Sequence, residues 1–279
     1  MNTASHLRQI LKHQGLMMPG VFNAVAALQA EQTGFQALYI SGAAIHNTNG
    51  LPDTGILGLE DFMNQIRNIC HAVDVPVIAD ADTGFSNVRR TVQEYERAGL
   101  AGLHIEDQIF PKRCGHLGGK EICSINDMQA RITLATQARK NNNFMIIART
   151  DARSEEGIQA AIERGGAYLD AGADALFAEA LRDEDEFRAF AQAFPDIPLL
   201  ANMTEFGRTP YFTENQFFDM GYRMIIYPMS ALRISMRATE FFYHRLYSEK
   251  TQLSEIHDMM TREELYQLLN YVIGEEHMP

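Results

Sequence analysis

Short apolar runs recur along the chain, each followed by a polar turn and a longer amphipathic stretch. The runs show little alternation, which is typical of strands buried on both faces of a parallel sheet, and the stretches between them fit crossover helices. Eight strands that alternate with helices predict a closed (β/α)8 barrel, with an open doubly wound sheet as the alternative. The runs are GVFN near 20, ALYISG from 37, VPVIADAD from 75, GLHIED from 102, FMIIART from 144, ALFAEA from 175, IPLLANM from 197 and YRMIIYP from 222.

Two of the intervening stretches carry clear helix signals. The stretch that starts at Ser154 offers this residue as an N-cap, followed by acidic residues and then by apolar residues at helical spacing. The stretch from 87 places Val92 and Tyr95 on one face, and Gly99 ends it. Both patterns predict helices that pack one face against the sheet.

Residues 230–273 look helical and are longer than one closing helix requires. This tail could pack on a neighbouring subunit, or it could be a simple helical extension of its own chain. The 279 residues suit one large barrel domain over 1–279, with 230–279 as a C-terminal helical extension.

Composition and charge narrow the classes of function. Hydrophobic residues make up 46% and charged residues 22% of the chain, which predicts an ordered globular protein. Lys and Arg number 24 against 36 Asp and Glu, so the net charge is −12. Nucleic acids and anionic membranes bind clustered cations, and this balance disfavours both as partners.

The N-terminal sequence has no apolar core of a signal peptide, and no run approaches the roughly 18 apolar residues of a membrane span. Cys70, Cys114 and Cys123 match no zinc or disulfide spacing, so reduced thiols are expected. Together these features predict a cytoplasmic protein. Cys70 lies in an apolar stripe and is expected in the core.

Polar residues end almost every apolar run. The catalytic groups of barrels gather at the carboxyl ends of the strands, so these residues are the candidates for chemistry. They are Ser41 and Gly42, Asp80 and Asp82, Glu106 and Asp107, Arg149 and Asp151, Glu179, and Asn202 and Thr204.

Asp80 and Asp82 stand two apart on a predicted strand, so their carboxylates are expected on one side, where they can share a hard cation. The alternative is an Asp-rich turn after a buried strand. Glu106 adds a third acid at the same rim, and converging acids repel unless a cation or an arginine neutralises them. Because all these ligands are oxygens, Mg²⁺ is the natural candidate.

Arg149 follows a strongly apolar run, where a solvated side chain is unexpected. It could bind a carboxylate or stabilise a developing oxyanion, and it could equally form a salt bridge to neighbouring acids. Asn202 and Thr204 could hydrogen-bond a substrate carboxylate or merely cap the next segment.

Cys114 lies in a polar loop, KRCGHLGGK, with Lys112, Arg113 and His116 around it. These cations would lower the pKa of the thiol, and the glycines would let the loop move. This pattern predicts a mobile lid that carries a reactive thiol. The alternative is that Cys114 is an incidental cysteine on a surface loop.

The segments KRCGH after an ED strand end, DADTGF and ARTDA together resemble the isocitrate lyase and phosphoenolpyruvate mutase superfamily over residues 18–273. Within it, LYISG, GLPDTGI, GLHIEDQ, NMTEFGRTP, YPMSALR and TREELY are most similar to the methylisocitrate lyases. The resemblance implies a Mg²⁺-dependent carbon–carbon lyase that splits 2-methylisocitrate, a tricarboxylate, into pyruvate and succinate in propionate breakdown. It also implies a homotetramer that exchanges its last barrel helix between subunits.

The resemblance carries roles to individual positions. It implies that Asp80 and Asp82 bind the metal and that Glu106 reaches it through water. It implies that Cys114 is catalytic, as the proton donor, with Arg149, and that Tyr39 and His116 are the two candidates for the base. The implied substrate-contacting positions are Ser41, Gly42, Ala43, Asp53, Gly115, Arg149, Glu179, Asn202, Met203, Thr204, Arg233 and Arg262.

Two segments depart from the pattern of the methylisocitrate lyases. Leu117, Gly118 and Gly119 look closer to dimethylmalate lyases and to carboxyphosphonoenolpyruvate mutases, whereas NMTEFGRTP favours methylisocitrate lyases. The second departure is SGAAIHNTNG, where His46 and Asn47 are unexpected, with surface loop variation as the alternative. The alternative functions are therefore 2,3-dimethylmalate lyase or oxaloacetate decarboxylase, then phosphonate mutase, and outside enzymes an inactive barrel that binds a ligand.

Overall fold

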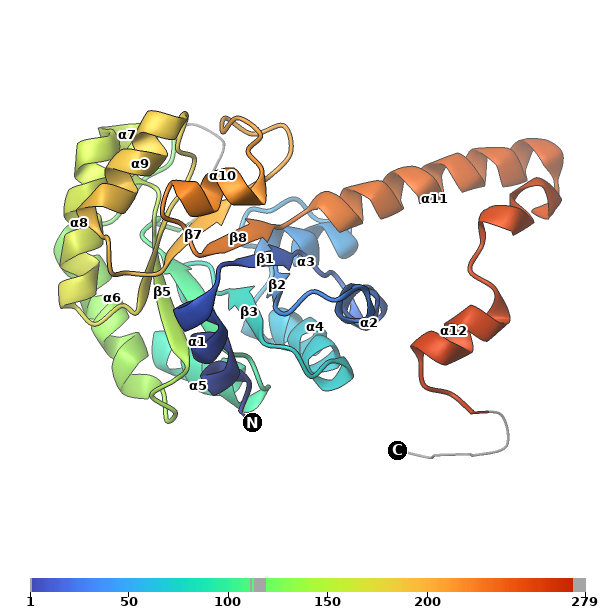
Figure 1. Ribbon diagram of the computed structural model, residues 1–279, viewed down its shortest axis with the longest axis horizontal. Coiled ribbons are helices and arrows are strands. Elements are labelled where there is room, and N and C mark those ends of the chain that lie inside the picture. The colour runs from blue at the N-terminus through green and yellow to red at the C-terminus, as the bar shows by residue number, and fades with distance from the viewer. Residues whose placement is uncertain (1, 111, 113–118, 273–279) are drawn as a thin grey trace.

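Eight parallel strands form the barrel that the alternating pattern predicts (Figure 1), in a computed structural model that describes residues 2–110, 112 and 119–272. The order around the sheet is β1-β8-β7-β6-β5-β4-β3-β2. A parallel bridge between Gly20 and Tyr39 joins β1 to β2 and so brings the two ends of the sheet together. The strands are β1 (Leu16–Pro19), β2 (Leu38–Ile40), β3 (Val77–Asp80), β4 (Gly102–Glu106), β5 (Met145–Thr150), β6 (Ala175–Ala178), β7 (Leu199–Asn202) and β8 (Met224–Tyr227).

Most helices of the described chain lie around the outside of the barrel, between successive strands, but the first helix precedes β1 and the last three follow β8 (Figure 1). Within the described residues the helices are α1 (Thr3–His13), α2 (Ala24–Thr33), α3 (Gly42–Thr48), α4 (Leu59–Ala72), α5 (Val88–Arg97), α6 (Ile125–Ala138), α7 (Ala152–Glu156), α8 (Ile158–Asp170), α9 (Glu184–Ala193), α10 (Glu214–Asp219), α11 (Ser230–Glu249), the 3-10 helix η1 (Leu253–Asp258) and α12 (Arg262–Leu268).

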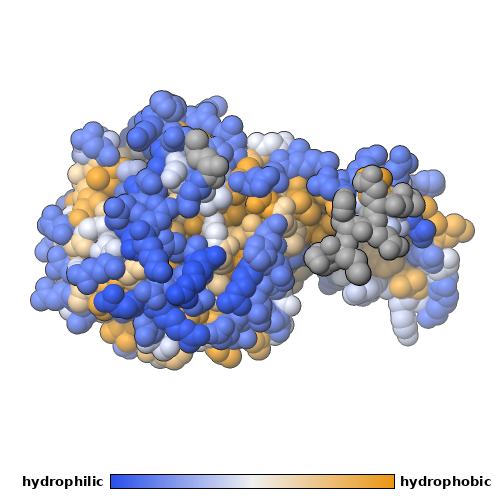
Figure 2. Space-filling view, turned by 90° about the horizontal axis from the view of Figure 1, so that it is seen from below, coloured by the Kyte–Doolittle hydropathy of each residue, from blue (hydrophilic) through white to orange (hydrophobic). Residues whose placement is uncertain are grey.

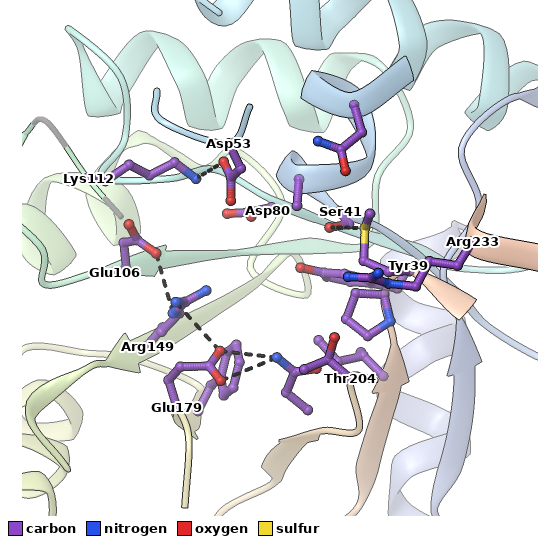
Figure 3. A pocket seen from close by; sticks show the side chains of 17 residues that line it. Tyr39, Ser41, Asp53, Asp80, Glu106, Lys112, Arg149, Glu179, Thr204 and Arg233 are labelled. Carbon is purple, nitrogen blue, oxygen red and sulfur yellow. Dashed lines mark hydrogen bonds and ion pairs between the residues drawn. The ribbon is translucent and has the colours of Figure 1, made fainter. Parts of the chain in front are cut away.

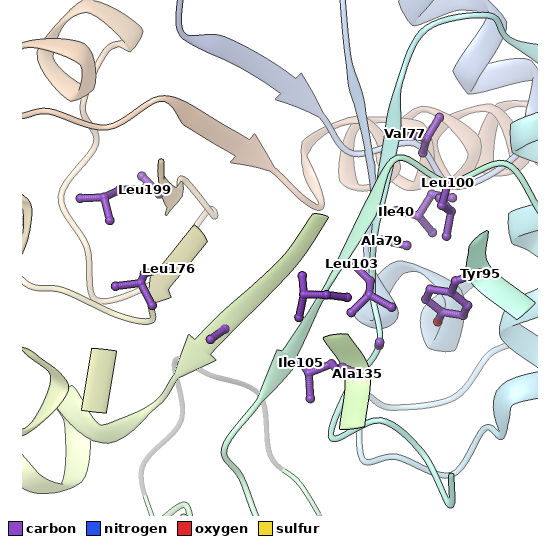
Figure 4. Close-up of a cluster of buried hydrophobic side chains, with 14 of the residues drawn as sticks. Ile40, Val77, Ala79, Tyr95, Leu100, Leu103, Ile105, Ala135, Leu176 and Leu199 are labelled. Atoms are coloured by element: carbon purple, nitrogen blue, oxygen red, sulfur yellow. The ribbon is translucent and has the colours of Figure 1, made fainter. Parts of the chain in front are cut away.

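The strands are buried on both faces, as their continuous apolar runs require. Outward-facing residues such as Ile40 and Leu103 pack with helix residues such as Tyr95, in the layer between sheet and helices (Figure 4). Residues that alternate with them along each strand, such as Tyr39, face the barrel interior and pack in a second cluster with Phe177. This alternation sets which side chain of each strand points into the barrel.

Helix α1 closes the amino-terminal end of the barrel. Its Leu7 is fully buried and packs in one cluster with Ala37, Ala101 and Ala175, which stand at or just before the starts of their strands. The opposite, carboxyl-terminal end is therefore the end that is open to substrate.

The structure corrects two local predictions. The first strand spans Leu16–Pro19, not the GVFN run near 20, because the backbone at Leu16 hydrogen-bonds beside β8 and the chain turns away after Gly20. Ser154 is not an N-cap but lies inside the short helix α7. Gly157, whose φ of 92° favours glycine, separates α7 from α8.

The C-terminal segment 230–272 is largely helical, as predicted, and forms an arm that projects from the barrel (Figure 1). Helix α11 runs away from the barrel, and α12 returns to lie beside α2. Within the described residues, no helix is both long and apolar enough to cross a membrane.

Candidate active site

A cavity at the carboxyl ends of the strands collects most of the predicted site residues (Figure 3). They arrive from all parts of the chain because parallel strands end at the same rim. Its lining includes Tyr39, Ser41, Ala43, Asp53, Asp80, Glu106, Arg149, Glu179, Asn202, Thr204 and Arg233, together with Asn47, Lys112, Phe177, Ile226, Pro228 and Met229.

The turn after β2 brings backbone against the acidic residues. Ser41 is the N-cap of α3, and the amide of Gly42 donates to Oδ2 of Asp80 at 3.2 Å. A Cβ at position 42 would lie 2.7 Å from that oxygen and 3.3 Å from Oδ1 of Asp82. Only glycine leaves room for both carboxylates at this point.

Asp80 and Asp82 converge by a different route from the one predicted. Asp80 is the last residue of β3, but Asp82 lies in the turn that follows, with a φ of 48°. The amide of Asp82 donates to Oδ1 of Asp80 at 2.9 Å, and this bond folds the turn back on the strand. The shared side of the two carboxylates is therefore a product of the turn and not of strand alternation.

Lys112 neutralises part of this acidic group. Its ammonium lies 2.8 Å from Oδ1 of Asp53 and also pairs with Asp82, and its side chain is only 4% exposed. Burial nevertheless raises the pKa of Asp82 from 3.8 to about 6, against the opposing effect of Lys112. A third acid, Glu106, is buried close by, and its Oε1 has no hydrogen-bond partner among the described residues.

Arg149 is the second buried cation of the site. Its Nε lies 2.9 Å from Oδ2 of Asp151 and 3.3 Å from Oε2 of Glu106, and its Nη2 lies 3.5 Å from Oε2 of Glu179. The guanidinium also stands over the ring of Phe177, 5.2 Å from the centroid. Arg149 is therefore placed for both predicted roles: it forms salt bridges to neighbouring acids, and it lines the cavity, where it can bind an anion.

The succeeding strands supply neutral and cationic polar groups. The amide of Asn202, at the end of β7, donates to both oxygens of Glu179 at 3.3 and 3.2 Å. Arg233, in the first turn of α11, pairs with Glu205 at 3.3 Å and stands over the exposed ring of Phe206. Arg233 thus forms a cationic edge at the mouth of the cavity (Figure 3).

Tyr39 lies in a buried cluster of polar side chains with His104 and Asp80. Its hydroxyl lies 2.8 Å from Nε2 of His104, and Nδ1 of His104 lies 3.6 Å from Oδ1 of Asp80. Burial and Asp80 raise the pKa of Tyr39 well above 10, so the tyrosine is protonated at neutral pH. Burial lowers the pKa of His104 from 6.5 to about 4, so this imidazole is neutral there.

Some predicted residues lie elsewhere. Cys114, Gly115 and His116 fall outside the described residues. Met203 packs in the hydrophobic core, where its sulfur accepts from the amide of Phe212 at 3.4 Å. Arg262 begins α12 on the arm and does not line the cavity.

Sequence reasoning missed other residues of the site. Lys112 was considered only as a neighbour of Cys114, and His104 was hidden inside an apolar run, where a histidine was itself the available signal. His46 is not surface loop variation: it lies in α3, is fully buried, and its Nδ1 is 2.8 Å from the carbonyl oxygen of Gly42. Asn47 is exposed but also lines the cavity.

The acids fit a hard cation by the chemistry of their donors. Every candidate ligand is a carboxylate oxygen, and Oε1 of Glu106 is a buried acceptor without a hydrogen-bond partner among the described residues. Within that part of the chain no three Asp, Glu, His or Cys side chains already converge as a complete ligand set. Lys112 and Arg149 provide the neutralising charge that the acids require.

The fold and the cavity define a (β/α)8-barrel protein whose polar site, at the carboxyl ends of the strands, combines buried acids with arginines suited to carboxylate substrates. The chain belongs to the phosphoenolpyruvate phosphomutase family, whose model matches residues 7–245.

Curated relatives are similar over nearly the whole chain. A protein of Bacillus subtilis named 2-methylisocitrate lyase is 45% identical, over 92% of this chain and 85% of its own. A protein of Aeropyrum pernix with the same name is 46% identical, over 95% of this chain and 86% of its own.

Solved structures of the same superfamily share the fold. A 2,3-dimethylmalate lyase has a TM-score of 0.91 and 35% identity, with 96% of this chain and 92% of that chain covered. An oxaloacetate acetylhydrolase in complex with 3,3-difluorooxalacetate has a TM-score of 0.91 and 34% identity, with 96% and 93% covered. A phosphonopyruvate hydrolase in complex with oxalate and Mg²⁺ has a TM-score of 0.88 and 30% identity, with 97% and 95% covered.

Proposed function

We propose that this protein is a Mg²⁺-dependent carbon–carbon lyase that cleaves 2-methylisocitrate into pyruvate and succinate, as a step of propionate breakdown. The observation that carries the proposal is the cavity in which buried acids, Arg149, Asn202 and Arg233 face one another. It is supported by relatives of that name that are 45% and 46% identical over most of the chain.

The reaction requires charge stabilisation at two places. The tertiary hydroxyl of the substrate loses its proton, the adjacent carbon–carbon bond breaks, and the electron pair goes to the carbon beside a carboxylate of the future succinate. The hydroxyl oxygen becomes the ketone oxygen of pyruvate, and the carbanion takes up a proton. A site for this reaction must hold carboxylates, stabilise oxygen charge and deliver one proton.

In this proposal Arg149 stabilises the oxygen that becomes the ketone, since its guanidinium is buried in the cavity and charged. Ser41, Gly42 and Ala43 hold the carboxylate of the pyruvate half, and Asn202, Thr204 and Arg233 hold those of the succinate half. Glu179 fixes the amide of Asn202.

Asp80 and Asp82 would hold Mg²⁺, with Glu106 acting through water; the Mg²⁺ in the phosphonopyruvate hydrolase complex supports the choice of metal. When bound, the ion would supply Lewis-acid stabilisation of negative charge on oxygen. Cys114 would donate the proton to the carbanion. Tyr39 and His116 are the two candidates for the base, and the hydroxyl of Tyr39 lies 2.8 Å from Nε2 of His104.

The arm supports a proposal about assembly. Large apolar side chains of the arm are exposed, and Figure 2 shows apolar surface on the arm and where it joins the barrel. We infer that the arm packs on a second copy in a helix-swapped homotetramer, which would also bring Arg262 to a neighbouring site. The exposed residues include Ile234, Met236, Phe241, Tyr243, Tyr247, Leu253 and Ile256.

The free thiols of Cys70 and Cys123 support a cytoplasmic location.

A second candidate is 2,3-dimethylmalate lyase or an oxaloacetate-cleaving activity on the same scaffold. The structural similarity to a dimethylmalate lyase and to an oxaloacetate acetylhydrolase favours it. The deciding experiment measures kcat/KM of the protein with Mg²⁺ on methylisocitrate, isocitrate, dimethylmalate and oxaloacetate. Higher kcat/KM on dimethylmalate or oxaloacetate than on methylisocitrate would reject the leading proposal, and turnover of none of the four would favour an inactive, ligand-binding barrel.

A further inference from the structure

Asp151 stands directly behind the arginine of the site without lining the cavity. Its side chain is fully buried, and the cavity lining includes Arg149 but not Asp151. Oδ2 of Asp151 accepts from Nε of Arg149 at 2.9 Å, and Oδ1 accepts from Nη2 at 3.2 Å. Two bonds to one planar guanidinium fix both the position and the plane of that group.

The other carboxylates near Arg149 hold it less closely. Glu106 and Glu179 approach the guanidinium to 3.3 and 3.5 Å, farther than Asp151 does. Of the three acids, Asp151 alone makes the two-bond fork among the described residues. The orientation of Arg149 in the cavity is therefore set from behind, by Asp151.

The backbone around Asp151 is anchored by a second buried acid. Asp107 accepts from the amide of Asp151 at 2.9 Å, and from the hydroxyls of Thr150 and Tyr168, both at 2.7 Å. Asp151 occupies the N-cap position of α7, but its side chain makes no capping hydrogen bond. An aspartate at this position ordinarily caps its helix, and here the carboxylate is turned inward to the arginine instead.

Lys120 binds the same carboxylate, at the oxygen Oδ1 that also accepts from Nη2 of Arg149. Its Nζ lies 2.6 Å from Oδ1 of Asp151, and both side chains are fully buried. The segment that carries Lys120 is fixed beside the end of β4, since the amide of Ile109 donates to the carbonyl oxygen of Glu121. This buried ion pair fixes the carboxylate that makes the two bonds to Arg149, so Lys120 acts on Arg149 through Asp151.

We propose that Asp151 and Lys120 are positioning residues that orient Arg149 toward the carboxylate or oxygen anion bound in the cavity. Neither residue touches the ligand, and both act through Arg149. The inference rests on the proposed function only in the choice of substrate, because any anion that Arg149 binds reports on the orientation.

The test uses two readouts on the full chain. The first is the dissociation constant of oxalate, measured by calorimetry with Mg²⁺ present; the second is kcat and KM on the substrate that the wild type turns over. Asp151→Asn should weaken oxalate binding by about tenfold and lower kcat by about 100-fold, with a smaller change in KM, since misdirection of Arg149 removes stabilisation of the transition state.

A matched control lies on the same short helix. Glu156 pairs with Arg164 and contacts neither Arg149 nor Lys120, so Glu156→Gln should leave both readouts unchanged. Lys120→Met should lower kcat by about tenfold, and Lys120→Arg, which keeps the charge, should regain most of it. That rescue separates a charge-positioning role from packing alone.

A folded Asp151→Asn protein with the oxalate affinity and kcat of the wild type would overturn the inference. If Asp151→Asn does not fold, equal values for Lys120→Met and the wild type would overturn it. A wild type that binds no oxalate would also contradict the inference, because Arg149 would then not be an anion anchor. A wild type that binds oxalate but does not cleave methylisocitrate would contradict the proposed function only.

Discussion

The ammonium of Lys112 lies 2.8 Å from the carboxylate of Asp53 and also pairs with Asp82, so one buried lysine joins the loop after β4 to two acids of the site. Because these side chains are largely withdrawn from water, each charge depends on its partners. This relationship makes Lys112 a part of the active site and not merely a neighbour of Cys114.

Replacement of this lysine should therefore affect both stability and turnover. Lys112→Met leaves Asp53 and Asp82 without their cation, and we expect the free energy of unfolding to fall by about 3 kcal/mol. We expect kcat/KM to fall by about 100-fold or more. Denaturant unfolding and steady-state kinetics measure the two effects. Lys12→Met, at an exposed position of α1, is the control, and a Lys112→Met enzyme with normal turnover would contradict this role.

If Asp80 binds Mg²⁺, replacing it with asparagine, which has nearly the same shape, should weaken Mg²⁺ binding. Asp80→Asn should weaken Mg²⁺ binding by about tenfold or more and lower turnover in parallel, since a neutral amide is a poorer ligand than a carboxylate. Calorimetric titration with Mg²⁺ and the rate as a function of Mg²⁺ concentration test this. Asp74→Asn, at an exposed position, should change neither. Full activity in excess chelator would rule out the metal site.

The buried His104 should make the free energy of unfolding decrease at acidic pH. Burial lowers its pKa from 6.5 to about 4 in the folded protein, so below pH 6.5 the unfolded chain binds a proton that the folded protein does not. The stability that this group contributes is present above pH 6.5 and is lost as the pH falls toward 4. In excess chelator, the unfolding free energy of His104→Gln should fall less steeply over this interval than that of the wild type. Parallel slopes for the two proteins would exclude His104 as the source.

Thiol labelling should distinguish the three cysteines. Burial raises the pKa of Cys70 to about 12, and Cys123 is also buried with a raised pKa, so neither forms a thiolate at neutral pH. Iodoacetamide at pH 7.5 should therefore modify Cys114 first, with loss of activity at the same rate, as followed by peptide mass spectrometry. Cys114→Ser should lower kcat by about 100-fold or more. Unchanged activity of Cys114→Ser would remove the thiol from the mechanism.

The arm should govern the oligomeric state. Tyr243 and Tyr247 are 62% and 79% exposed on α11, and charged residues there would oppose the burial of this face against a second copy. Tyr243→Glu combined with Tyr247→Glu should shift the protein to smaller species in analytical ultracentrifugation. Lys12→Glu, at an exposed position of α1 outside the arm, is the control. A wild type that sediments as a monomer would reject the swapped tetramer.

The sequence by itself determined that strands alternate with helices, which favours a closed barrel over an open doubly wound sheet, and it identified most residues of the site. Continuous apolar runs can only be buried on both faces, and the polar residue that ends each run must then lie at the common rim. Arg149, Glu179, Asn202 and Asp80 all lie where this reasoning placed them. The resemblance to known lyases assigned roles to these positions.

Only the tertiary structure decided which of these groups are partners. The positive φ of Asp82, and not the period of a strand, turns its carboxylate toward that of Asp80, and local sequence does not reveal this turn. Lys112 reaches Asp53 and Lys120 reaches Asp151 across long separations in sequence, since the barrel brings the loops of several strands to one end. Ion pairs between distant loops depend on the geometry of closure, and no periodicity in the chain encodes that geometry.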